Sequence, residues 1–536
     1  MEDICKDCTY TICGRLPVHT YTPRECKLSN GKPCQECVHW QMAKLDSQIS
    51  QLHSQLVQLT HNRHVLITKI NQRHEPFIHR LPLSVSSQIF EEYVHQVHSD
   101  FDPKEASDST HVKDWSPALF LSSICATWRR IAFATSEIWR FINIPLREDN
   151  PDVDLKITLL DECVGRSCQR TLFIGVFQFQ MYEDPDFSRL QEKLNKLRFL
   201  FEAIKKTACG AEEITLWGLP TPALQHIIPT NTPNLTMVRI AEHVREYLDY
   251  IWTNDADFSL AGPLLKNLDF GYGSEDLLRY CKIDWRTITT VTMSAILLRE
   301  GIRILRLAPC LTSCSFIFVD IDSVDPVNPP IVNSTLEKLH VDFSNCGQDV
   351  VVETFAESVT LPSLRELSLL SSVFLYMMPL FERSRCQVRR LSLTLYQNNP
   401  EEQALMLLSV LPHVEHFALE SCITFQKPII TSKFFEELRD PRFLQSGAST
   451  KPLLPKLTSL SYMGKKDFTW AAFLKMFPPP GDVLVPVNRR PLSEVSLNLY
   501  LPKAVIGDPD VIAKLREIQQ SKIKLVVTNL DGKDLL

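Results

Sequence analysis

LRELSL, residues 364–369, is the clearest copy of a short unit that recurs from about residue 150 to the end of the chain. The unit has the pattern apolar-x-x-apolar-x-apolar, and its second half alternates as the side chains of a strand do. Most neighbouring copies begin roughly 23 to 30 residues apart, which is the period of a repeat. The copies are Ala211/Ile214/Leu216, Leu235/Val238/Ile240, Leu265/Leu268/Phe270, Ile288/Val291/Met293, Leu311/Cys314/Phe316, Leu336/Leu339/Val341, Leu364/Leu367/Leu369, Val388/Leu391/Leu393, Val414/Phe417/Leu419, Leu457/Leu460/Tyr462 and Leu492/Val495/Leu497.

This repeat predicts an α/β solenoid over residues 150–536. The second and third apolar residues of each unit face one core, and the segment between units, helical in places such as 402–411, covers that core. One repeat cannot bury its apolar face alone, whereas stacked neighbours can. An ordinary α/β domain with similar strands is the alternative. Eleven recurrences favour irregular leucine-rich repeats, although the inner Asn or Cys of strict repeats is mostly missing.

Residues 41–76 carry a different period, that of a coiled-coil-like amphipathic helix. Its apolar residues recur at alternating steps of four and three, which is heptad spacing, and Arg63 fills the one place in the series that is not apolar. Such a stripe needs a partner. Either a second copy of the chain pairs through residues 45–70 to form a homodimer, or the helix packs on the chain's own neighbouring helices. The stripe consists of Leu45, Ile49, Leu52, Leu56, Leu59, Leu66 and Ile70.

Residues 77–146 contain a Leu-Pro start followed by two amphipathic patterns. We expect one helix over 84–97 and a second over 118–133. Their apolar side chains are too many for an isolated pair of helices, so some must form a small core and others must be covered by a partner or by neighbouring elements. The residues concerned are Leu81, Pro82, Ile89, Phe90, Leu121, Cys125 and Trp128.

The Leu-Pro start, the Ile-Phe pair and the Cys and Trp-Arg that follow in this order resemble an F-box, a small all-α domain. The order of heptad helix, F-box and irregular leucine-rich repeats, from about residue 45 to the end, is similar to F-box proteins abundant in mushroom-forming (basidiomycete) fungi. The resemblance implies that Leu81, Pro82, Ile89, Phe90, Leu121, Cys125 and Trp128 bind a Skp-family adaptor, with Trp128 serving mainly as local core.

The same resemblance implies a function without catalysis. The adaptor would join the chain to a cullin scaffold, and the repeat surface would hold an unidentified protein target for ubiquitination by other subunits. The alternative is a leucine-rich-repeat scaffold with no ubiquitin-ligase role, in which the F-box-like helices only seal the open end of the solenoid.

Residues 1–40 are rich in cysteine. Cys5-x-x-Cys8 and Cys34-x-x-Cys37 each offer two thiols at a spacing that one metal ion bridges, and together they could complete a tetrahedral set for a structural Zn²⁺. The alternative is a tail with unpaired thiols. A zinc-dependent enzyme built on these cysteines would require an open coordination position, which four sulfur ligands do not leave. The F-box resemblance does not predict this segment.

The length, charge and composition of the chain exclude several classes of function. A chain of 536 residues is too long for one compact core. Its net charge of -6 and pI of 6.2 provide no basic field for nucleic acid. No apolar run approaches the ~20 residues of a membrane helix, and the start of the chain carries no secretory signal pattern. The absence of a membrane or secretory pattern predicts a protein of the cytoplasm, the nucleus or both. Because the common nucleophile, metalloprotease and phosphate-loop motifs are missing, we expect that the protein is not an enzyme and that it binds no cofactor apart from the zinc ion discussed above.

Overall fold

The computed structural model divides the chain into two compact units, Met1–Glu92 with Leu121–Ala134, and Tyr93–Phe120 with Thr135–Leu536. The four predicted zinc ligands, Cys5, Cys8, Cys34 and Cys37, lie outside the described residues. The residues that the structure describes are 38–73, 81–99, 117–146, 152–178, 187–219, 221–241, 258–271, 278, 281–319, 326–346, 349–371, 374–395, 400–421, 430–438, 452–477, 490–500, 508–520, 523–529 and 532–535.

The first unit is helical. It contains α1 (Val38–Arg73), the first part of α2 (Leu83–Ser99), the end of α4 (Pro117–Ile124) and α5 (Ala126–Ala134). The start of α2 follows the Leu-Pro dipeptide, since the Pro82 carbonyl accepts hydrogen bonds from the N–H groups of Val85 and Ser86, both at 3.0 Å. Proline suits this place because the first turn of a helix needs no backbone donor there.

The single helix expected over 118–133 is wrong, because the chain breaks it at Cys125 into α4 and α5. Cys125 occupies the N-cap position of α5. Its carbonyl accepts the hydrogen bond of the Arg129 N–H at 2.9 Å, and its Sγ accepts that of the Trp128 N–H at 3.5 Å. Helices commonly begin with a residue whose side chain accepts a hydrogen bond from the backbone N–H of the third residue after it.

The second unit is mixed α/β and is built on one 14-stranded parallel sheet. Within this sheet the strands lie in the order in which they occur along the chain, so each one pairs with its neighbours in sequence, as in a stacked repeat. The strands are β1 (Phe141–Leu146), β2 (Leu172–Gln178), β3 (Ala211–Trp217), β4 (Met237–Ala241), β6 (Asn267–Phe270), β8 (Thr290–Ile296), β9 (Ser313–Val319), β11 (Lys338–Asn345), β13 (Glu366–Ser371), β14 (Arg390–Leu395), β15 (His416–Ser421), β16 (Ser459–Gly464), β17 (Glu494–Leu499) and β18 (Lys524–Asn529).

All eleven apolar units of the sequence coincide with strands of this sheet, β3 through β17. Their second apolar residues pair directly across neighbouring strands, as Leu367 does with Leu339 on one side and Leu391 on the other. The third apolar residues do the same, and both sets are buried. Small pairs of strands stand apart from the main sheet, β5 (Phe258–Leu260) with β7 (Cys281–Ile283) and β10 (Ile331–Val332) with β12 (Val359–Thr360).

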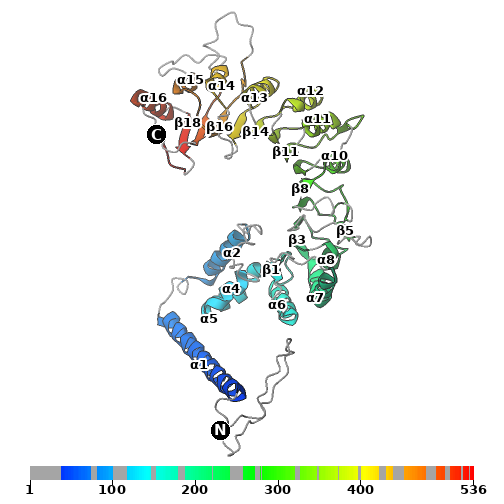
Figure 1. Cartoon of the computed structure of the whole chain (residues 1–536), viewed down its shortest axis with the longest axis vertical. Coiled ribbons are helices and arrows are strands. Elements are labelled where there is room, and N and C mark those ends of the chain that lie inside the picture. The colour runs from blue at the N-terminus through cyan, green and yellow to red at the C-terminus, as the bar shows by residue number, and fades with distance from the viewer. Residues whose placement is uncertain are drawn as a thin grey trace, which may run out of the picture. The chain divides into compact units, whose positions relative to one another are not determined.

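Helices and 3-10 turns connect the strands and cover one face of the sheet. Figure 1 shows α10 through α16 along one side of the strands β8 to β18. The covered face is filled with aromatic rings, such as Phe318, whose ring centroid lies 5.2 Å from that of Phe343 and 5.8 Å from that of Phe355. The elements are η2 (Ser136–Arg140), α6 (Val153–Arg166), α7 (Phe187–Ala208), α8 (Thr221–Ile227), α10 (Leu298–Leu307), α11 (Asp349–Ser358), η4 (Phe374–Met377), α12 (Met378–Ser384), α13 (Pro400–Ser409), α14 (Ser432–Glu437), α15 (Trp470–Leu474) and α16 (Pro509–Gln520).

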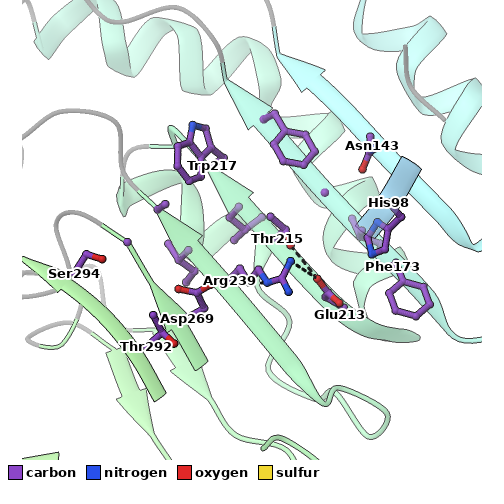
Figure 2. A pocket seen from close by; sticks show the side chains of 17 residues that line it. His98, Asn143, Phe173, Glu213, Thr215, Trp217, Arg239, Asp269, Thr292 and Ser294 are labelled. Atoms are coloured by element: carbon purple, nitrogen blue, oxygen red, sulfur yellow. Dashed lines mark hydrogen bonds and ion pairs between the residues drawn. The ribbon is translucent and has the colours of Figure 1, made fainter. Parts of the chain in front are cut away.

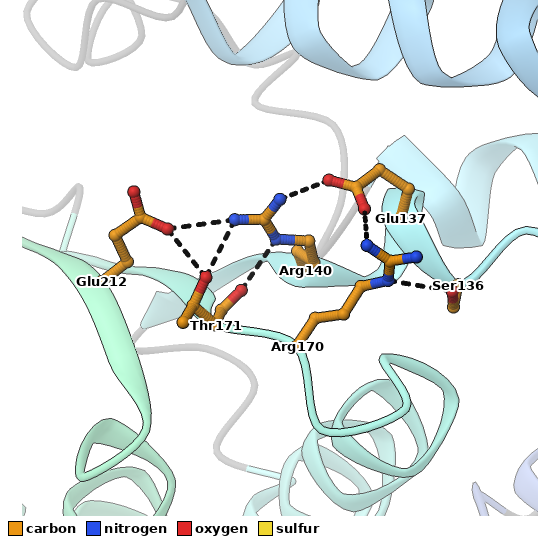
Figure 3. Close-up of polar contacts among 6 residues, drawn as sticks. All are labelled: Ser136, Glu137, Arg140, Arg170, Thr171 and Glu212. Carbon is orange, nitrogen blue, oxygen red and sulfur yellow. Dashed lines mark hydrogen bonds and ion pairs between the residues drawn. The ribbon is translucent and has the colours of Figure 1, made fainter. Parts of the chain in front are cut away.

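A polar network fixes the first strands of the sheet (Figure 3). The Arg140 side chain, at the end of η2, donates to the carbonyl oxygen of Thr171 at 2.8 Å and forms ion pairs with Glu137 and, at 3.1 Å, with Glu212. Glu137 in turn pairs with Arg170 at 2.7 Å. The network joins η2, the start of β2 and the start of β3, and its central pair, Arg140 and Glu137, is less than one-fifth exposed and so is screened less by water than a surface pair.

Replacing Arg140 by alanine is expected to lower the free energy of unfolding by about 2–3 kcal/mol, because it leaves the half-buried Glu137 and Glu212 without this cation. Urea denaturation followed by circular dichroism measures the change. The matched control is Arg198→Ala, which removes an exposed ion pair with Glu202 inside α7 and should change stability by less than about 0.5 kcal/mol. Equal effects of the two substitutions would contradict a structural role for the network.

Candidate functional site

The seven predicted adaptor-binding residues divide into two groups in the first unit. Phe90 and Leu121 are 1% and 3% exposed and therefore belong to the small core, where the ring of Phe90 packs against that of Trp128 at 5.0 Å between centroids. Ile89 is 44% exposed. Pro82 is exposed as well, whereas Leu81, Cys125 and Trp128 are intermediate. The surface available to a partner therefore excludes Phe90 and Leu121.

Other apolar side chains in the first unit are exposed that the sequence pattern did not single out. In α2 and α5 these are Leu83, Val85 and Phe133, which are 38–55% exposed. Ile124, which the amphipathic pattern of 118–133 places on the inward face, is 38% exposed as well. Val85 and Ile89 lie one helical turn apart and share a face of α2. The signal that could have found them is the 3.6-residue period itself, since an apolar residue on a face other than that of Phe90 must be covered by something else.

The heptad stripe of α1 is uncovered in the described part of the chain. Its seven apolar side chains are each more than half exposed, from 53% at Leu45 to 65% at Leu59. No other helix of the described residues covers the stripe, and both alternatives for this helix, pairing with a second copy of the chain and packing on its own neighbouring helices, stay predictions. The stripe remains available to another molecule.

The uncovered face of the sheet presents a row of side chains that we call the middle row. Each member lies between the second and third apolar residues of its strand, and pairing brings these members side by side. The row is polar and charged on the first strands and turns to small residues on the later ones. On the strands from β1 to β17 it consists, in strand order, of Asn143, Gly175, Thr215, Arg239, Asp269, Thr292, Ser315, His340, Ser368, Ser392, Ala418, Ser461 and Ser496.

A groove of about 400 Å³ follows the later part of the middle row, over β9 to β16. Its floor is formed largely by serines, and charged side chains line its edge. There Lys338 and Arg390 pair with Glu366 at 3.1 and 3.5 Å. These pairs are exposed, so they contribute little to stability and mainly set the pattern of charge that a ligand meets.

A pocket of about 370 Å³ lies over the first part of the row, from β1 to β8 (Figure 2). Arg239 stands between two carboxylates, with its Nη1 3.4 Å from Glu213 Oε1 and its Nε 3.9 Å from Asp269 Oδ2. Thr215 adds a hydrogen bond from its hydroxyl to Glu213 Oε1 at 3.4 Å. We call this set the charged pocket.

Burial changes the titration of two side chains in the charged pocket. It raises the pKa of Glu213, an effect that Arg239 opposes by attracting the carboxylate. Burial, together with the nearby charge of Arg239, lowers the pKa of His98 to about 4. His98 lies against the rings of Phe141 and Phe173, at 4.7 and 5.3 Å between centroids, so it is a neutral imidazole at pH 7.

The walls of the charged pocket are aromatic. Phe173, Phe177 and Trp217 line it, and Gly175 makes room for one of them. A Cβ at Gly175 would lie 2.4 Å from the ring of Phe177 and 2.8 Å from the Asn143 side chain, so only glycine allows this ring to fold over β2.

Neither a metal-binding cluster nor a membrane-spanning helix is found among the described residues. Nowhere among them do three or more His, Cys, Asp or Glu side chains gather so as to hold a metal ion. None of the helices in this part of the chain combines the length and the apolar character needed to cross a bilayer. Compared with known proteins, the chain matches no family model, and no curated protein matches it.

Proposed function

We propose that this chain is the substrate-recognition subunit of a Skp–cullin–F-box ubiquitin ligase. The observation that carries the proposal is the set of exposed apolar side chains in the first unit, after the Leu81-Pro82 start. Ile89, Leu83 and Phe133 are 42–55% exposed while Phe90 closes the small core beneath them. Apolar side chains held at the surface by an already closed core are typical of a docking surface.

The second unit supports the other half of this function. In the proposal, its strands and connecting helices are irregular leucine-rich repeats, and the uncovered face of the sheet holds a protein target. A sheet of fourteen strands offers one continuous surface, along which side chains of neighbouring strands stand side by side. The middle row then contacts the target, while the apolar residues on either side of it stabilise the fold.

The mechanism is one of proximity. Docked on the adaptor, the chain raises the effective concentration of target lysines near the ubiquitin-transferring subunits, and it contributes positioning without taking part in bond formation. The competing proposal is an interaction scaffold in which the helices merely cap the sheet.

Replacing Ile89 by lysine is expected to weaken adaptor binding about 30-fold or more, because a charge would enter an apolar interface. Co-expression with a fungal Skp adaptor, size-exclusion chromatography with light scattering, and calorimetry measure the complex. The matched control is Gln88→Lys, an adjacent exposed polar residue on α2, which should bind as the unaltered chain does. If the unaltered chain forms no one-to-one complex, or if I89K binds equally well, the scaffold is the better description.

We also propose that α1 joins two copies of the chain as a parallel coiled coil through residues 45–70. In the heptad frame, Ile49 and Ile70 take the a positions at its two ends and leucines take every d position, a combination that favours two parallel strands. Arg63 falls at an a position, where a polar residue fixes the register of the two helices at a cost in stability.

Leu52→Lys combined with Leu59→Lys is expected to convert the dimer to a monomer, because the charges would meet at the seam. Arg63→Leu should lower the dissociation constant about tenfold, since it removes two facing charges from that seam. Sedimentation velocity measures both. The control is Val57→Lys, which changes an apolar side chain that is 58% exposed but lies off the seam. A monomer for the unaltered chain at micromolar concentration would refute the coiled coil.

A further inference from the structure

The groove over β9 to β16 has a floor of serines, and we call it the serine groove. Its serines are Ser313, Ser315, Ser368, Ser392, Ser459 and Ser461. Within the described residues their hydroxyls hydrogen-bond to no other group, so they can donate to a ligand or accept from it. The groove crosses six neighbouring strands, and five spacings of ~4.8 Å make roughly 24 Å, the length of about seven extended residues. An extended segment of another protein therefore fits this floor in length and in hydrogen-bonding capacity.

Basic side chains outnumber acidic ones in the serine groove. Among the residues that line it, Lys338 and Arg390 are cations, and Glu366 is the one carboxylate. Strand pairing places Glu366 between the two cations, where its carboxylate lies 3.1 Å from Lys338 Nζ and 3.5 Å from Arg390 Nη1. Within the described part of the chain neither cation has a further partner. Burial lowers the pKa of His340, so this imidazole on the floor is neutral at pH 7 and does not change the balance.

Other charges near this face do not cancel the excess. Asp342 lies four residues beyond Lys338 on β11, and Glu420 lies four residues beyond His416 on β15. Four residues of a strand span about 13 Å, which exceeds the Debye length of ~8 Å at physiological ionic strength. The row just before these strands contains two acids and two bases, which balance one another: Glu337, Arg365, Arg389 and Glu415.

Arg390 is the cation that Glu366 leaves available. Because Glu366 lies closer to Lys338 than to Arg390, Lys338 is the main partner of this carboxylate. Arg390 uses one of its five N–H donors, at a distance longer than the usual 2.7–3.2 Å, and its side chain is 62% exposed. Its neighbour on the side away from Glu366 is His416, and Ser392 follows it on the same face. A guanidinium with free donors suits a carboxylate, which it can bind through two parallel hydrogen bonds.

We propose that the serine groove holds an extended segment of the target protein, and that Arg390 binds an acidic side chain of this segment. That the segment belongs to a target of ubiquitination rests on the proposed function. Its acidic chemistry rests on Arg390, Lys338 and Glu366 alone. A basic side chain in the same place would meet two cations and a carboxylate that both of them already contact.

Calorimetric titration of the full chain with acetyl-Gly-Ser-Ala-Glu-Ala-Ser-Gly-amide tests the proposal, at low ionic strength where exposed charges are least screened. Comparison peptides carry glutamine or lysine in place of glutamate. We expect the dissociation constant of the glutamate peptide to be about tenfold lower than that of either comparison peptide. Arg390→Gln should abolish this preference, and Arg390→Lys should retain part of it, because the charge stays while the paired hydrogen bonds are lost.

The matched control is Arg303→Gln on α10. It removes an arginine that is 58% exposed and paired with one carboxylate, that of Glu300, so the net charge of the chain changes as it does in R390Q. This variant should keep the full preference for the glutamate peptide. An equal loss of preference in R303Q and R390Q would show that only the net charge of the chain matters, and would overturn the proposal.

Glu366→Gln separates the two signs of charge. For an acidic ligand this substitution removes a repelling carboxylate and should tighten the glutamate peptide several-fold, whereas weaker binding of that peptide by E366Q would contradict the proposal. Equal binding of the glutamine peptide, preferred binding of the lysine peptide, or no binding by any peptide would each overturn it as well. The adaptor complex is measured in parallel. Its failure to form with the unaltered chain would count against the ligase function alone, since peptide binding does not depend on the adaptor.

Discussion

The structure depends on one constraint: no strand of the sheet can by itself pair its backbone hydrogen-bonding groups or bury its apolar side chains. A parallel strand needs a neighbour on each side for its backbone hydrogen bonds, and its apolar residues need the same neighbours to exclude water. The repeated apolar unit meets both needs at once, because the residues that pair across strands, such as Leu339, Leu367 and Leu391, are also those that fill the core. The connecting helices and the aromatic rings beneath them are arranged around that requirement.

The first strands of the sheet are held by polar as well as apolar contacts. There the regular apolar contacts are joined by a charged network in which Arg140 connects η2 to the turns that start β2 and β3. The last turn of α2 also belongs to this region, since His98 packs on Phe141 and Phe173. The same strands carry the charged pocket, which His98 and Phe173 also line. Stabilising contacts and pocket-lining groups are therefore concentrated in the same neighbouring strands.

Much of the sheet could be predicted from the sequence. Apolar residues alternate within each unit, and the units follow one another at a roughly regular spacing, so both patterns can be read along the chain. Three strands were missed for local reasons. The apolar pattern of β1 begins at Trp139, inside the segment assigned to the F-box, while Thr171 and Lys522 stand where β2 and β18 would need an apolar residue. The break at Cys125 was missed because a thiol is a weak helix cap.

The charged pocket could not be predicted, for a different reason. Glu213, Arg239 and Asp269 lie in three successive units, and nothing in the neighbourhood of any one of them distinguishes it from a solvent-exposed charge. Only the register of β3, β4 and β6 brings them together. His98 comes from a helix much earlier in the chain. Sites that depend on register across repeats require the pairing of strands to be known first.

The alternation of side chains along each strand also divides the chain into residues that must be kept and residues that can vary. Ser368 faces solvent between Leu367 and Leu369, which face the core, and the same holds for Ser392 between its two leucines. A substitution at such a serine therefore alters the surface without disturbing the packing beneath it, and its effect reaches only the adjoining strands. Such a surface can acquire a new specificity one residue at a time while the fold that supports it is inherited unchanged.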